Sequence, residues 1–250
     1  MRATENWNFY ALRVDDNPAS NCVDLGVAAS APISGFDTLS YISVEMNNPR
    51  EDGLSNGDEL EALGAIEDTL QLLVRGSSEV IYVGRSTHNG TRDFYLYTQG
   101  DVLEPLAKRL IDACPSYRLT FGSQSDPDWG VYWRFLYPSP DDFQRMGNRD
   151  VLDQLLAHGD DPDLLREIDH FALFDTTGDI EGFVKSLQGT AIGEVKVETD
   201  AEGVTTVAFK TFGSLSDIDE VTIALSRAAE VHDGNYDGWG CAATSADPGD

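Results

Sequence analysis

The feature that most restricts the fold is an order of strand-like and helix-like segments that occurs twice. In the first half, residues 38–46 alternate with period two, which is typical of a strand. Residues 58–73 carry Leu and Ile at helical spacing, with acidic residues in the first turn, where the helix dipole favours them. The remaining segments of this half are two strands joined through Asn89-Gly90, a helix and a strand, at 79–87, 92–98, 102–113 and 117–122.

The second half has the same order. Residues 177–187 place Ile180, Phe183, Val184 and Leu187 on one helical stripe. The last helix is expected to begin at Ser216, with Asp219 in an N-cap signature. Strands are expected at 168–174, 194–199, 204–212 and 241–244. The chain is therefore predicted to be α+β, with two tandem ferredoxin-like (βαββαβ) sandwiches.

An extra β-hairpin is expected before the first sandwich. Residues 7–14 and 22–27 are apolar-rich runs that flank a turn-forming cluster. Residues 1–138 are predicted to form an N-terminal α+β domain, whose aromatic-dense end, 126–138, is expected to be core and lid. Residues 139–149 are predicted to be a linker that is helical through Met146. Residues 150–250 are predicted to form a second domain that ends in a short disordered tail.

The acidic composition limits the classes of partner. The formal net charge is −27, with an isoelectric point near 4.2, so the chain repels phosphate backbones and direct binding of nucleic acid is not expected. Residues 1–147 carry 11 basic and 22 acidic residues, and residues 148–250 carry 6 and 22, which gives net charges of −11 and −16. The acidity favours a protein partner with a basic segment, or it serves only solubility or tolerance of high salt.

The cysteines and the hydropathy indicate the compartment. Cys22, Cys114 and Cys241 are far apart and form no C-x-x-C pair, which fits reduced thiols. No apolar run approaches the ~20 residues of a membrane helix, and no signal peptide is evident. We expect a cytoplasmic protein.

Motifs for catalysis, metals and cofactors are lacking. No His has a second His or a Cys at ligand spacing, and no nucleophile elbow, P-loop or dinucleotide fingerprint occurs. The cluster Asp160-Asp161-Pro162-Asp163 lacks the alternating spacing and the distant Glu of a calcium loop. We interpret it as a helix cap, with Asp at the N-cap and Pro at the first helical position. The chain is predicted not to be an enzyme and to need no metal or cofactor.

The heptapeptide at residues 235–241 combines two aromatic residues, a carboxylate and two glycines. Asp237-Gly238 suits a tight turn, since Asp bonds its own backbone and Gly accepts a positive φ. We expect a bend that holds Tyr236 and Trp239 on either side, followed by the short closing strand at 241–244.

Two resemblances to known families rest on these segments. The helix at 150–158 that ends at Gly159, the acidic turn at 160–163, the Ile168-Asp169-His170-Phe171 strand and the Tyr236-Asp237-Gly238-Trp239 motif resemble regulator of ribonuclease activity B, over residues 148–244. Trp7, the Asn89-Gly90 hairpin and the aromatic end of the first half are similar to a bacterial domain family of unknown function, over residues 5–145.

The first resemblance implies a function. Members of that family inhibit ribonuclease E by contacting its scaffold part, so the chain is expected to be a non-catalytic regulator that binds such a protein and modulates RNA degradation. The family's usual N-terminal acidic helix is replaced here by a whole domain, so the target is open. The alternative is an enzyme or small-ligand binder with a pocket between the two domains, lined by His170, Tyr236 and Trp239.

The candidate partner-binding residues come from the turn, the strand and the heptapeptide. We expect Trp239 to be largely buried, and Tyr236, Asp237 and the turn at 160–163 to lie nearer the surface. His170 alternates with Ile168 and Ala172, which favours a core or edge position over a catalytic role. The full set is Asp160, Asp161, Asp163, Asp169, His170, Tyr236, Asp237, Gly238 and Trp239.

Overall fold

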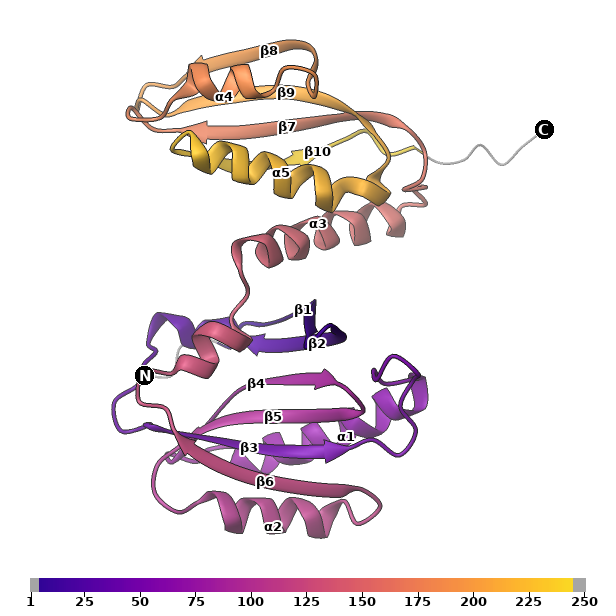
Figure 1. Ribbon diagram of the computed structural model, residues 1–250, viewed down its shortest axis with the longest axis vertical. Coiled ribbons are helices and arrows are strands. Elements are labelled where there is room, and N and C mark those ends of the chain that lie inside the picture. Colours follow the sequence, from indigo (N-terminus) through magenta and orange to yellow (C-terminus); the bar gives the residue numbers. More distant parts are fainter. Residues whose placement is uncertain (1–4, 245–250) are drawn as a thin grey trace, which may run out of the picture. The chain divides into compact units, whose positions relative to one another are not determined.

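The computed structural model describes residues 5–244 and divides the chain into two compact units, Met1–Ser139 and Pro140–Asp250. Each unit contains an antiparallel sheet with helices between its strands, so the fold is mixed α and β (Figure 1). No helix within the described range is long and apolar enough to cross a membrane. The tail predicted to be disordered falls mainly on residues 245–250, which lie outside this range.

The described part of the first unit has a six-stranded sheet in the order β1-β2-β4-β5-β3-β6. Its strands are β1 (Trp7–Val14), β2 (Asn17–Asp24), β3 (Thr38–Glu45), β4 (Val80–His88), β5 (Thr91–Thr98) and β6 (Arg118–Ser125). Its α-helices are α1 (Gly57–Val74) and α2 (Leu103–Ala113), and it also has a short 3-10 helix, η1 (Leu25–Ala29), and a short π-helix, η2 (Tyr132–Leu136). The expected N-terminal hairpin is present as β1 and β2, which pair antiparallel, but its second strand is Asn17–Asp24 and not 22–27, because residues 25–27 belong to η1.

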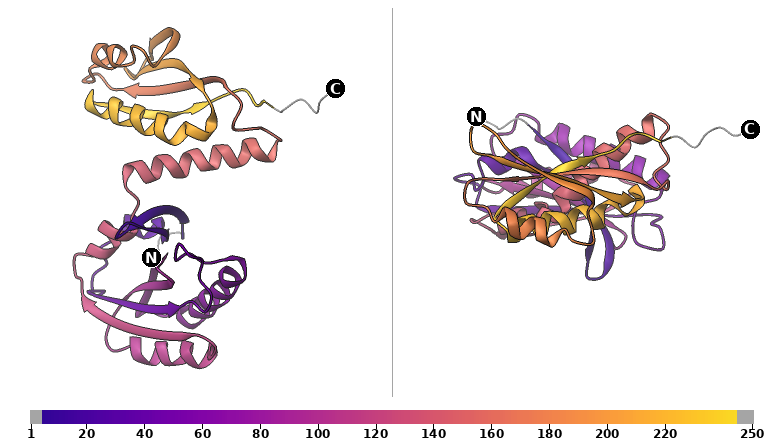
Figure 2. Two further views of the ribbon diagram at one scale, coloured as in Figure 1. Left: turned by 45° about the vertical axis from the view of Figure 1, so that its right-hand side comes forward. Right: turned by 90° about the horizontal axis from the view of Figure 1, so that it is seen from above.

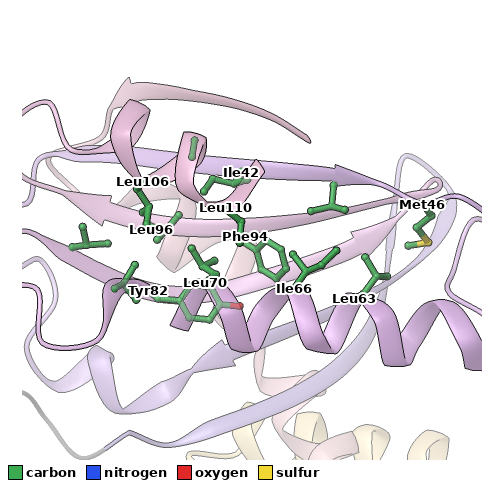
Figure 3. Packing of buried hydrophobic residues seen from close by; sticks show 14 residues of the cluster. Ile42, Met46, Leu63, Ile66, Leu70, Tyr82, Phe94, Leu96, Leu106 and Leu110 are labelled. Carbon is green, nitrogen blue, oxygen red and sulfur yellow. The ribbon is translucent and has the colours of Figure 1, made fainter. Parts of the chain in front are cut away.

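Helix α1 shows how the sequence sets an element and its buried face. The Asn56 side chain accepts a hydrogen bond from the Glu59 backbone N–H (2.8 Å), which satisfies one free donor of the first turn. Leu63, Ile66 and Leu70 follow at helical spacing, and all three are buried. Figure 3 shows them projecting from α1 toward the apolar side chains of the sheet.

Part of the opposite face of this sheet is covered by the aromatic segment that follows β6. The Trp129 ring stacks on Tyr97 with 3.9 Å between ring centroids, and its Nε1–H donates to the Phe36 carbonyl (2.9 Å). Trp129 and Tyr132 are fully buried. The aromatic density of residues 126–138 is therefore mainly core, as expected from the sequence.

The described part of the second unit has a four-stranded sheet in the order β10-β7-β9-β8. Its elements are α3 (Pro140–Ala157), β7 (Arg166–Phe174), α4 (Ile180–Ser186), β8 (Ile192–Thr199), β9 (Thr205–Gly213), η3 (Leu215–Asp217), α5 (Ile218–Val231) and β10 (Gly234–Gly240). Figures 1 and 2 show α4 and α5 on one side of these strands. Side chains of both helices pack there on Ala172, Phe174, Val207 and Phe209.

Two predicted segments differ from the structure. The helical linker and the helix expected at 150–158 are one element, because α3 runs without a break from Pro140 to Ala157. Pro suits the first helical position, where its missing N–H costs nothing. The turn at 160–163 caps no helix: the Asp161 side chain accepts from the Asp163 N–H (3.0 Å), and β7 follows at Arg166.

The buried stripe of α1 gives a direct test. Leu70→Ala should lower the free energy of unfolding by about 3 kcal/mol, because this side chain is fully buried and its loss leaves a cavity. Leu72→Ala, on the same helix, is the matched control: Leu72 is 67% exposed, so the change should stay within ~0.5 kcal/mol. Urea unfolding followed by circular dichroism measures both, and equal losses would contradict the assigned face.

Candidate functional site

The Tyr236-to-Trp239 motif lies within β10 and contains a β-bulge. Tyr236 pairs with Ala172 and Trp239 pairs with His170, and the register shifts between Tyr236 and Gly238. Two residues three apart point to opposite faces of a regular strand, but one extra residue restores a common face. Asp237 is that extra residue, and Gly238 takes the positive φ of 141° next to it.

The structure corrects three predictions about this motif. Tyr236 and Trp239 lie on the same, helix-covered face of the sheet, not on either side of a bend. The expected closing strand at 241–244 is absent, because β10 ends at Gly240. The predicted exposures are also reversed: Tyr236 is 7% exposed, whereas Trp239 is only partly buried.

His170 lies on β7, the strand that pairs with β10, and is fully buried. Its Nδ1 lies 2.7 Å from the Tyr236 hydroxyl and its Nε2 lies 2.8 Å from the Thr211 hydroxyl, so both ring nitrogens are satisfied. The ring also stacks on Phe209 at 5.3 Å. Burial lowers the pKa of His170 to about 4, so the imidazole is neutral at pH 7. His170 is therefore a core residue with no exposed surface.

Trp239 holds helix α3. Its Nε1–H donates to Asn148 Oδ1 (2.8 Å). Asn148 is fully buried, and its Nδ2 donates to Asp219 Oδ1 (2.7 Å) and to the Thr222 hydroxyl (2.8 Å), both on α5. Gln144 Nε2 donates to the same Asn148 oxygen (3.0 Å). Asn148 thus joins α3, α5 and β10, a role that sequence reasoning missed because its partners lie 71 to 91 residues away.

The acidic turn at 160–163 anchors the chain after β10. The Asp160 carboxylate and the Arg166 guanidinium form a buried ion pair (2.7 Å), and the Thr244 N–H donates to the same carboxylate oxygen (2.7 Å). The Asp161 N–H donates to the Thr244 carbonyl (3.0 Å). The hydrogen bond from Arg166 holds the pKa of Asp160 below its usual range. Asp160 is therefore a structural charge, while Asp163 stays exposed.

A surface that the sequence did not single out lies on the other side of the second sheet. We call it the outer face, and its β7 and β9 side chains are Glu167, Asp169, Phe171, Leu173, Thr206, Ala208, Lys210 and Phe212. None of the eight is buried. Phe171 is 39% exposed and Phe212 is 59% exposed. The sequence did contain a signal for this surface: in β7, Glu167, Asp169, Phe171 and Leu173 alternate with the core residues Ile168, His170 and Ala172.

Charged side chains surround these two rings. Lys210 Nζ lies 2.8 Å from Glu167 Oε2 and 3.5 Å from Asp169 Oδ1. These two carboxylates raise the pKa of Lys210. Asp237 is also exposed, at the bulge of the edge strand. The outer face therefore combines exposed aromatic rings with an excess of carboxylates.

The nine predicted site residues fall into three groups. His170, Tyr236 and Trp239 face the core. Asp160, Asp161 and Asp163 form the turn. Asp169, Asp237 and Gly238 lie where β7 and β10 meet solvent, none of them buried. Across residues 5–244, no group of three or more His, Cys, Asp or Glu side chains is arranged to hold a metal ion.

The Trp239–Asn148 contact predicts a measurable coupling. Trp239→Phe keeps the ring but removes the N–H donor, so the free energy of unfolding should fall by about 1–2 kcal/mol. Trp239→Ala should lower it by about 3–5 kcal/mol. In a double-mutant cycle with Asn148→Ala, the two losses should be less than additive, because each variant breaks the same hydrogen bond. Strict additivity would show that the contact stabilises nothing.

The neutral His170 predicts a pH dependence. The pKa of His170 is lower in the folded state than in the unfolded state. As the pH falls from 6.5 to 4, His170 is therefore protonated in the unfolded chain but stays neutral in the folded chain. Stability should therefore fall by up to about 3 kcal/mol over this range and then level off for this group. The His170→Gln variant should lack this component, and His158→Gln, at an exposed position, should keep it. Parallel curves for wild type and His170→Gln would refute the assignment.

Comparisons with known proteins bear on identity. A family model for regulator of ribonuclease activity B matches residues 145–241, and a model for a family of unknown function (DUF695) matches residues 5–137. No curated protein matches the chain. A crystal structure of an unknown protein from Galdieria sulphuraria is 14% identical, covers 80% of this chain and 96% of its own, and has a TM-score of 0.22, which is too low to support an argument.

Both family matches fall in the order that the sequence motifs indicated, so the two resemblances are confirmed. The first match spans more than half of the 250 residues. The chain belongs to the family of unknown function DUF695, and its C-terminal part carries a segment that matches regulator of ribonuclease activity B.

Proposed function

We propose that the protein is a non-catalytic regulator whose second unit binds a protein of the ribonuclease E type and modulates RNA degradation. The observation that carries this proposal is the match of residues 145–241 to regulator of ribonuclease activity B. The matched range contains most of α3 and every strand of the second sheet, so a complete folded unit is involved.

Charge supports a basic partner segment. Residues 148–250 carry a net charge of −16, with 22 acidic and 6 basic residues. Opposite charge on a partner would speed association and suppress wrong partners, although screening limits its reach to about 8 Å at physiological salt. Charge alone therefore sets the type of partner and the rate of encounter, and a second contribution is needed for a lasting complex.

The outer face supplies such a contribution. Aromatic side chains are common hot spots in protein interfaces, and Phe212 is more than half exposed. Asp169 and Asp237, two of the residues expected from the sequence to bind a partner, add negative charge next to these rings. Asp161 and Asp163 add negative charge at the turn. We assign His170, Tyr236 and Trp239 a supporting role, since they hold the sheet and α3 in place.

We also infer that each unit is a ferredoxin-like sandwich. The strands β4-β5-β3-β6 of the first unit are the second, third, first and fourth of its βαββαβ order. Read from β8 to β10, the second sheet has the same order. Antiparallel pairing throughout both sets supports the assignment.

Binding of a ribonuclease E scaffold fragment to the full chain tests the proposal. Phe212→Ser should weaken binding at least ten-fold, because it removes a ring of hot-spot type, and should leave the melting temperature nearly unchanged. Val231→Ser is the matched control, since Val231 is 79% exposed but lies on α5. Isothermal calorimetry at low and physiological salt measures both variants.

The outcomes separate the parts of the proposal. Asp169→Asn should reduce the salt dependence of association more than the affinity at high salt. Equal binding by wild type and Phe212→Ser would exclude the outer face as the interface. No binding by the wild-type chain at any salt would remove the proposed function.

A further inference from the structure

The first unit contains a cavity of about 1200 Å³ that has no role in the proposed function of the second unit. Its walls come from the start of β1, the end of β2 with η1, the loop at residues 30–36, the last turns of α1, and residues 77–82. This volume is sufficient for an organic ligand, since ligand pockets are commonly about 300–1,000 Å³.

The cavity follows from the extra hairpin. Strands β1 and β2 widen the sheet by two strand spacings, about 10 Å, which is close to the diameter of a helix. Among residues 5–139, however, no third α-helix is supplied to cover the added width. The face of β1 that carries Trp7 accordingly leaves Phe9, Ala11 and Arg13 exposed. The loop after η1 closes part of this space and leaves the rest open.

The wall has a large apolar and aromatic part. Trp7 packs on Tyr82 with 5.1 Å between ring centroids, and the Tyr82 hydroxyl is held by Glu67 (2.9 Å). Leu72 also lines the cavity and is 67% exposed, although it is a large aliphatic side chain. A Trp face beside aliphatic groups can bind an apolar body and can attract a cation through its ring electrons.

The charged part of the wall is acidic. Glu5, Asp24 and Asp68 line the cavity together with Arg75, which gives a net charge of −2 for these four side chains. Among the described residues, none of the three carboxylates forms an ion pair. The last carbonyls of α1, near Arg75, add partial negative charge at the same end of the cavity.

Asp24 distinguishes this wall from an ordinary acidic surface. It is 5% exposed, and its Oδ1 accepts hydrogen bonds from the Asn6 and Gly26 backbone N–H groups (2.8 and 2.9 Å). Within residues 5–244, its second oxygen accepts no hydrogen bond. A nearly buried carboxylate with a free oxygen in a cavity wall is best compensated by a cationic group that enters the cavity.

We propose that this cavity binds an organic cation that consists of an ammonium group on an apolar body. The ammonium group pairs with Asp24 and Asp68, and the body packs on Trp7 and Leu72. The first unit is then a small-molecule binding module, independent of the partner proposed for the second unit.

Three probes with the same body and different charge test the proposal on the full chain: 4-phenylbutylamine, 4-phenylbutanol and 4-phenylbutyrate. Tryptophan fluorescence and thermal shift measure binding. The amine should bind at least ten-fold more tightly than the carboxylate, with the alcohol between them. Absence of saturable binding by the amine, or tighter binding of the carboxylate, would overturn the proposal.

Variants locate the site. Asp68→Asn and Asp24→Asn should each weaken binding of the amine about five-fold or more and leave binding of the alcohol unchanged. Arg75→Gln should strengthen binding of the amine, because it removes a positive charge from the cavity wall. The Asp24→Asn change keeps an oxygen for the two backbone donors, and Asp68 is exposed, so at least one of the pair retains the fold. Asp112→Asn, on α2 and outside the cavity, is the control for loss of net charge. An equal effect of Asp112→Asn would refute the site.

Discussion

The second unit depends on one buried amide. Asn148 has no exposed surface, so each of its polar atoms must find a partner inside the protein or cost about 1–3 kcal/mol. It finds them on α5, on β10 and on its own helix. Trp239 and Thr222 therefore help to fix α3 against the sheet, together with the packing of Leu152 and Leu155. The segment from Pro140 onward belongs to this unit. Replacing Trp239 or Thr222 would leave a buried polar atom of Asn148 without one of its partners.

The hydrogen bond from Trp239 to Asn148 requires the β-bulge in β10. Trp239 reaches Asn148 because its ring points to the helix-covered face, and it points there because Asp237 adds one residue to the strand. Without the extra residue, Trp239 would face the outer side while Tyr236 kept its contact with His170. Gly238 makes the bulge possible, since its φ of 141° is strained for any residue with a side chain.

Local sequence patterns were sufficient for most elements and insufficient for the site. Period-two alternation and Asn89-Gly90 predicted the first sheet, because both signals are contained within a few residues. The faces to which Tyr236 and Trp239 point could not be predicted in this way. They depend on a β-bulge, and a bulge is defined by pairing with the neighbouring strand β7, which is far away in the sequence. The break expected between Met146 and Asp150 is absent for a similar reason: Gly147 and Asn148 lower helix propensity locally, while the distant partners of Asn148 compensate. The cavity of the first unit could not be predicted from the sequence, because its walls come from five separate segments of the chain.

The two units provide an internal comparison for the outer face. Both sheets place helices on one side, and an antiparallel sheet can leave its other side in water if polar residues occupy it. The first unit covers part of that side with Trp129 and Tyr132, both fully buried, and leaves Tyr41 38% exposed there. The second unit offers no such cover among its described residues, yet it keeps Phe171 and Phe212 exposed there. Solubility alone would favour polar residues at these two positions, so the exposed rings support a partner that completes the covering from outside.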